Sequence, residues 1–201
     1  MTLRALGRRE IDALQELASI GCGAAVTALG RLSGRRLHMD VPEIWSGAEE
    51  GAIADFLGAA GQDLAAVAVA LDGMLEGTLV LALPVPDAAR LAAALGWPAP
   101  EGGAWGELTE SALMESGNVA GSAFVSAVAR LAGRKLLVGV PRLARGGGRA
   151  CLDALVPREV GKVALATRFG CEDPQLEGLL LVMPEPGRIP GLLAALPLGA
   201  V

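Results

Sequence analysis

The chain has 201 residues, of which 52% are apolar and only 3% aromatic, so it can bury a sizeable core made mostly of Ala, Val and Leu. Its net charge of −5 and pI near 5.0 show no excess of positive charge of the kind that nucleic-acid-binding proteins carry. One histidine and three cysteines without a CxxC pair argue against a Ser-His-Asp hydrolase, a structural zinc site and a disulfide scaffold, which leaves carboxylates, amides and hydroxyls for any catalysis.

The N-terminal segment, MTLRALGRRE, lacks the long apolar stretch and the cleavage site of a secretory signal. The charge-free stretches Leu17–Gly30 and Ser116–Ala129 are shorter than the roughly 18–20 apolar residues that a membrane-spanning helix needs. We therefore expect a soluble cytoplasmic protein with no membrane insertion and no nucleic-acid partner.

The first half of the chain predicts a long helix, then a short apolar strand through His38 that ends at Pro42, where the missing N–H ends a ladder. His38 is expected to be an ordinary surface or packed residue of that strand. Two further strands, AVAVAL and GTLVLAL, are joined by the turn-like DGMLE and predict a hairpin. The segment DAARLAAALG predicts a closing helix. Cys22, in the first helix, is expected to be a small core residue.

The second half repeats this order after PAPEGGA, a predicted linker flanked by Trp97 and Trp105. A long helix with a stop signal at Gly133 precedes a strand that ends at Pro141. The glycine-rich LARGGGRA lacks the GxxxxGK[ST] spacing of a phosphate-binding loop, and we expect it to be a mobile loop. The segments KVALATRF and GLLLVM, joined by GCEDPQLE, predict another hairpin, and RIPGLLAALP a closing helix.

The two halves also match residue by residue. When the sequence is shifted by 99 positions, Asp12–Pro42 lies on Ser111–Pro141 without a gap, and more than a third of the 31 aligned residues are identical. LEGTLVLALPVP matches LEGLLLVMPEP at a shift of about 100. We predict one domain over residues 1–201, built from two repeats at about 8–98 and 107–199. The fold class is α+β, a pseudo-two-fold duplicated unit with helices packed on a largely antiparallel sheet.

The second long helix carries a polar stripe. Ser111, Glu115, Asn118 and Ser122 are spaced by three or four residues, so they share one face of the helix. Small residues, among them Gly117, lie beside them, although a helical glycine costs about 1 kcal/mol relative to alanine. Such a cost suggests that something approaches the backbone closely. Any solvent-facing helix shows polar residues at this spacing, however, so the stripe alone does not identify a site.

The pattern Ser-x3-Glu-x2-Asn-x22-Pro, formed by Ser111, Glu115, Asn118 and Pro141, resembles the signature of the CheC/CheX/FliY chemotaxis phosphatase family. The surrounding ESALMESGNVAGSAF, the later GLLLVMPEP and the duplicated layout over nearly the whole chain are also similar to that family. The resemblance implies a hydrolase, a phosphatase that acts on the phospho-aspartate of a CheY-like response-regulator receiver in two-component signalling.

The resemblance implies that Glu115 and Asn118 are catalytic: the asparagine amide orients the attacking water, and the glutamate pairs with a receiver lysine. Ser111, Gly117 and Ser122 are expected to bind the partner around them. A carboxamide has both a donor and an acceptor and can hold a water in line without titrating. No metal ligands or bound cofactor are expected in this chain, because the receiver would supply the Mg²⁺.

The first repeat departs from the family pattern. Asp12 and Glu16 stand at the matching positions, but Ser19 replaces the asparagine. We expect a degenerate first site, in which Glu16 still helps to bind a receiver or the helix is now only structural. The alternative function for the whole chain is a non-catalytic scaffold that binds a receiver, a CheD-type deamidase or a flagellar switch component.

Overall fold

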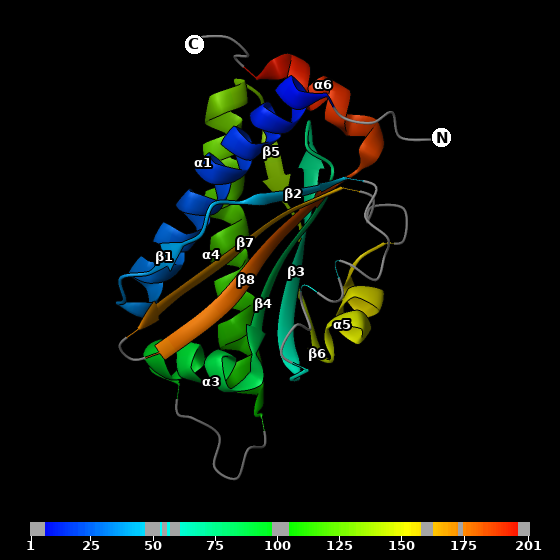
Figure 1. Cartoon of the computed structure of the whole chain (residues 1–201). Coiled ribbons are helices and arrows are strands. Elements are labelled where there is room, and N and C mark those ends of the chain that lie inside the picture. The colour runs from blue at the N-terminus through cyan, green and yellow to red at the C-terminus, as the bar shows by residue number, and fades with distance from the viewer. Residues whose placement is uncertain are drawn as a thin grey trace.

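The computed structural model describes residues 7–46, 53, 56, 61–97, 105–157, 163–172 and 175–196. One eight-stranded sheet forms the centre of this part of the chain, with helices on both of its faces (Figure 1). The predicted α+β class is confirmed. The predicted linker at residues 98–104 lies outside the described residues.

Two long helices, α1 (Arg8–Ser33) and α4 (Glu107–Ala132), have 26 residues each and begin 99 positions apart. Each ends at a glycine in the left-handed conformation, Gly34 with φ 67° and Gly133 with φ 61°. Glycine adopts this conformation without the penalty that a Cβ atom imposes, which explains why both helices stop there. The predicted helices and the stop signal at Gly133 are confirmed.

Within the described residues every strand pair of the sheet is antiparallel. The strand order is β1-β7-β8-β4-β3-β5, with β2 also paired to β7 and β6 to β3. The strands are β1 (His38–Met39), β2 (Glu43–Ser46), β3 (Leu64–Gly73), β4 (Gly77–Pro84), β5 (Leu136–Val138), β6 (Arg142–Gly146), β7 (Val163–Glu172) and β8 (Gln175–Pro184). The predicted hairpins are the pairs β3–β4 and β7–β8.

The pairing of β4 with β8 at the centre of the sheet relates the two halves. Val80 faces Leu181, which is 101 positions later and belongs to the matching strand of the second half. On either side, Leu79 faces Val182 and Leu81 faces Leu180. This register is the one that a two-fold axis between Val80 and Leu181 requires, and it confirms the pseudo-symmetric layout. The repeat boundaries at 8–98 and 107–199 stay a prediction.

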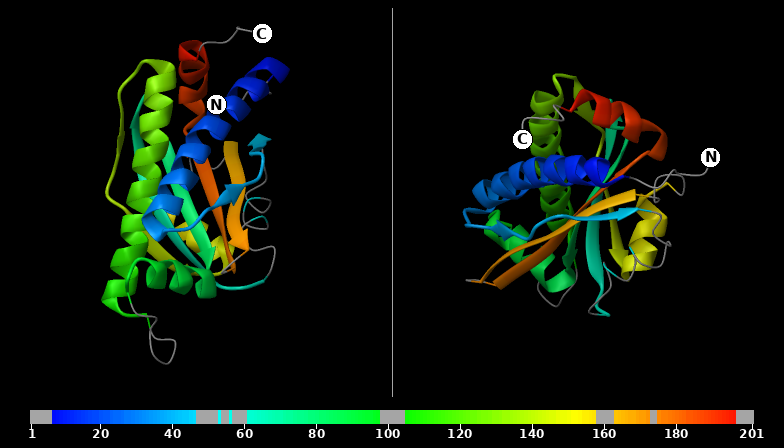
Figure 2. Two further views of the ribbon diagram at one scale, coloured as in Figure 1. Left: turned by 90° about the vertical axis from the view of Figure 1, so that its left-hand side faces the viewer. Right: turned by 45° about the horizontal axis from the view of Figure 1, so that its top comes forward.

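Apolar side chains alternate along the strands and build a core on each face of the sheet. On β3, Val67 and Val69 face α1 and α4, whereas Ala66 and Ala68 face the opposite side. There α5 (Gly148–Leu155) covers the sheet (Figure 2). The closing helices are α3 (Val85–Ala94) and α6 (Ile189–Ala195), the latter preceded by the 3-10 turn η2 (Pro186–Arg188). As the composition predicted, the cores are mostly Ala, Val and Leu.

Two connections differ from the sequence prediction. The segment after Pro141 is not a mobile loop: Arg142–Gly146 forms β6 against β3, and α5 begins at Gly148. The connection predicted over GCEDPQLE is also shorter, because β7 runs to Glu172 and β8 begins at Gln175, directly opposite it. In both places the side chains show no clear strand pattern in the sequence. The neighbouring strand nevertheless supplies hydrogen-bond partners for the backbone N–H and C=O groups, and this pairing extends the strands.

Among the described helices, α1 is long and apolar enough to cross a membrane by length and composition alone, with a mean hydropathy of 1.2. However, 56% of its apolar window is buried inside the fold, and α1 packs along α4. Gly21 makes this approach possible, since a Cβ there would lie 2.4 Å from the Phe124 ring. Burial and close packing of this kind are the properties of a core helix of the fold.

Cys22 is fully buried on α1, as predicted, and burial raises the pKa of its thiol to about 12. A raised pKa keeps the thiol protonated, so almost no reactive thiolate exists at pH 8. We expect Cys22 to resist iodoacetamide in the folded protein at pH 8 and to react once the protein is unfolded in guanidinium chloride. Peptide mass mapping measures this, and labelling of Cys22 before unfolding would contradict the burial.

Candidate functional site

The polar stripe on α4 lies on the solvent side of the helix. Ser111 and Glu115 are exposed, and Asn118 and Ser122 are half-buried. Among the described residues, neither the Glu115 carboxylate nor the Asn118 amide has a hydrogen-bond or ion-pair partner. The structure thus brings together the four residues of the predicted stripe, with a carboxylate and an amide one turn apart and available to a partner.

Gly117 does not belong to this exposed surface. A Cβ at Gly117 would lie 2.4 Å from Val67 Cγ1, and one at Gly121 would lie 2.6 Å from Val69 Cγ2. Both glycines are buried, and they let α4 pack closely on β3. The predicted role of Gly117 in partner binding does not fit this position, because the close approach that its missing side chain permits is to the protein's own sheet.

The turn that contains Pro141 lies beside the same stretch of α4. Val138 Cγ1 lies 3.5 Å from the position of a Cβ on Gly121, and the Gly139 N–H donates a 2.8 Å hydrogen bond to the Ala70 carbonyl of β3. Val140, which follows, is 84% exposed. Pro141 therefore follows a strand that packs against α4 at Gly121, three residues after Asn118 on the helix.

The matching stripe on α1 has the same exposure but different contacts. Asp12 and Glu16 are exposed, and Ser19 is half-buried. The Ser19 hydroxyl donates to the Gln15 backbone carbonyl at 2.8 Å, and Gln15 Nε2 donates to the Pro42 carbonyl at 3.3 Å. Sequence reasoning missed Gln15. Its only signal was the alignment of the two halves, in which Met114 occupies the equivalent position.

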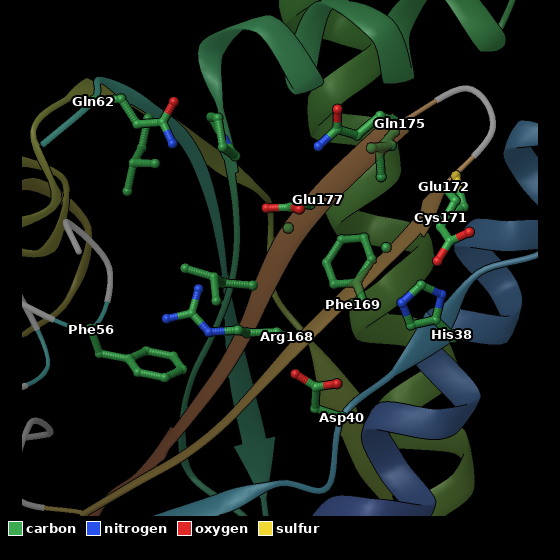
Figure 3. Close-up of a pocket in the computed structure, with 16 residues that line it drawn as sticks. His38, Asp40, Phe56, Gln62, Arg168, Phe169, Cys171, Glu172, Gln175 and Glu177 are labelled. Carbon is green, nitrogen blue, oxygen red and sulfur yellow. The ribbon is translucent and has the colours of Figure 1, made fainter. Parts of the chain in front are cut away.

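A hollow of about 640 Å³ lies apart from both stripes, over β7 and β8 (Figure 3). Its rim includes His38, an exposed strand residue as predicted, and the Arg168 guanidinium, which lies 4.7 Å from the Phe56 ring centroid. Neither Glu115 nor Asn118 lines it. The residues that the structure describes contain no group of three His, Cys, Asp or Glu side chains that could hold a metal ion.

Comparisons with known proteins find relatives at low identity. The chain is 30% identical over 139 residues to the CheY-P phosphatase CheC of Bacillus subtilis (strain 168), a match that covers 67% of the chain and 65% of that relative. It is 26% identical over 182 residues to the putative CheY-P phosphatase CheC1 of Halobacterium salinarum, covering 88% of the chain and 91% of that protein. No family model matches.

Solved structures share the fold. Thermotoga maritima FliY superimposes with a TM-score of 0.70 at 18% identity, over 95% of this chain and 98% of that one. A chain of the CheX-CheY-BeF3-Mg+2 complex from Borrelia burgdorferi superimposes with a TM-score of 0.56 at 19% identity, over 86% and 98% of the two chains. At these identities the likeness is one of fold.

Proposed function

Because this chain belongs to the CheC/CheX/FliY family, we propose that it hydrolyses the phospho-aspartate of a CheY-like response-regulator receiver in the cytoplasm. The observation that carries the proposal is the pair of side chains on α4, the Glu115 carboxylate and the Asn118 amide. Both lie on the solvent side of a rigid, well-packed helix and are not engaged by other described residues. The packed helix fixes the backbone from which both side chains project, so only their own rotamers must be ordered when a partner docks.

Hydrolysis of a phospho-aspartate requires little from the protein other than positioned groups and favourable charge. Phosphoryl transfer proceeds with charge spread over the phosphoryl oxygens, so catalysis is mainly alignment of the nucleophile and electrostatic stabilisation. An amide such as that of Asn118 can accept a hydrogen bond from a water and donate one to a phosphoryl oxygen. The Glu115 carboxylate, one turn away, can pair with a receiver lysine and fix the orientation of the two proteins.

The direct test is a phosphate-release assay. Phosphorylated receivers from the same organism are followed with and without the protein. We expect hydrolysis of at least one receiver to accelerate beyond its intrinsic rate, in proportion to the concentration of the protein. Equal rates for every receiver, with and without the protein, would reject the proposal.

We further propose that the Mg²⁺ in this reaction belongs to the receiver. The motivation is the absence of a metal-ligand cluster among the residues described here. Chelation with EDTA is expected to remove the acceleration, and added Mg²⁺ to restore it, whereas the melting temperature of this protein alone should not change. Full acceleration after complete chelation would contradict this assignment.

The alternative is a binding module that docks a receiver, a CheD-type deamidase or a flagellar switch component without catalysis. It is favoured by the first repeat, which keeps Asp12 and Glu16 exposed but has lost the asparagine at position 19. Binding of a stably phosphorylated receiver analogue without any acceleration of phosphate release would favour this alternative over the enzyme.

A further inference from the structure

The position one residue before each glutamate of the two stripes distinguishes the repeats. In the first repeat it is Gln15, whose Nε2 donates to the Pro42 carbonyl at 3.3 Å. In the second it is Met114, which is half-buried. A thioether has no N–H to donate, so position 114 cannot tie α4 to the Pro141 carbonyl in the same way.

Gln15 also occupies the helix position one turn before Ser19, the residue that replaces the asparagine. Residues four apart on a helix are neighbours on one side, so Gln15 is next to Ser19. Its side chain reaches from α1 to Pro42, and its backbone carbonyl accepts the Ser19 hydroxyl at 2.8 Å. The polar groups at this position are therefore satisfied within the protein. Pro42 is buried, whereas Pro141 is half-buried.

We propose that Gln15 closes the first site by holding the Pro42 turn against α1, and that the second site stays open to the receiver because position 114 carries no hydrogen-bond donor. The inference rests on the proposed phosphatase function of Glu115 and Asn118. It means that loss of the asparagine is only part of the difference between the two sites, and that the residue at position 15 or 114 contributes as well.

The first test transfers the closing contact to the second site. Met114→Gln places an amide one turn before Asn118, at the position equivalent to Gln15, and Met114→Leu is the matched control without a donor. We expect Met114→Gln to lower kcat by about tenfold or more, Met114→Leu to keep it, and the melting temperature of both to stay within about 2 °C of the unaltered protein. Full turnover of Met114→Gln would overturn the inference.

The second test repairs the first site in a protein whose second site is disabled by Asn118→Ala. Adding Ser19→Asn alone should leave the protein inactive, and adding Gln15→Met as well should restore measurable phosphate release. Restoration by Ser19→Asn alone, or no restoration by the two together, would overturn the inference. The proposed function is judged separately, from the unaltered protein against Asn118→Ala.

A third measurement does not depend on activity. Gln15→Met should speed amide hydrogen exchange in the peptide that contains residues 40–44, because the Pro42 turn loses the contact that holds it to α1. Exchange in the peptide around Pro141 should not change. Equal exchange with and without the Gln15 side chain would show that the contact does not close the turn.

Discussion

Replacing Asn118 with alanine is expected to remove most of the phosphatase activity and to leave the fold intact. The amide has no partner among the described residues, so its removal leaves no buried polar group without a hydrogen bond. Surface changes of this kind alter the free energy of unfolding by less than about 0.5 kcal/mol, and alanine is the better helix former by up to about 0.7 kcal/mol. Loss of a positioned group lowers the rate by about 100-fold.

The informative comparison combines phosphate release with the melting temperature of the same variant. Ser126→Ala, at an exposed position of the same helix, controls for the general effect of alanine on α4. Binding of a phosphorylated receiver analogue should weaken less than turnover, because Glu115, the proposed contact to a receiver lysine, is still present. If Asn118 were instead a structural residue, its variant would be destabilised by about 1–3 kcal/mol and would retain its turnover per folded molecule.

Gly117→Ala is expected to have the largest effect on stability. The added methyl group would lie 2.4 Å from Val67 Cγ1 and 2.9 Å from Val67 Cβ, inside the core between α4 and β3. Overpacking of this kind costs about 1–3 kcal/mol, more than the roughly 1 kcal/mol that alanine gains over glycine in a helix. Because α4 must shift to relieve the contact, turnover per folded molecule should also fall.

The matched control is Gly23→Ala on α1, where a Cβ meets no atom within 4 Å. Urea denaturation should show Gly23→Ala to be as stable as the unaltered protein or up to about 1 kcal/mol more stable. Val67→Ala removes Cγ1, the nearer of the two colliding atoms, so the double variant with Gly117→Ala should be less destabilised than the sum of the two single variants. Strict additivity would mean that the two residues do not meet.

The elements that the sequence predicted correctly are those with strong local signals. Glycines mark the ends of α1 and α4, and runs of Val, Leu and Ala mark β3, β4, β7 and β8. In each of these elements the local sequence is enough to indicate the structure. The internal repeat then implied the symmetric sheet. The strands β2 and β6 were missed because they are short and are held by pairing with distant partners, β7 and β3. Cys151 and Leu155 are both apolar and four positions apart, a helical spacing that indicates α5.

The candidate site shows a similar division. The spacing of Ser111, Glu115, Asn118 and Ser122 placed them correctly on one face of a helix, and their roles stay predictions. The small residues beside the stripe carry no clear apolar periodicity, so the sequence did not show that Gly117 faces β3, and it was assigned to a partner. The contact between Gln15 and Pro42 joins residues 27 positions apart through one side chain, and no local sequence pattern indicates it.

The two-fold register of Val80 and Leu181 also bears on how one repeat came to lose its asparagine. The halves pair across β4 and β8 as two subunits of an isologous dimer would, with equivalent surfaces facing each other. In a dimer of identical chains, any substitution appears on both subunits, so an altered site is altered twice. Joining the subunits in a single chain frees each from the other, and Ser19 and Asn118 can then coexist in one molecule. Covalent fusion thus gives a protein of this symmetry one way to change one site while its twin is kept.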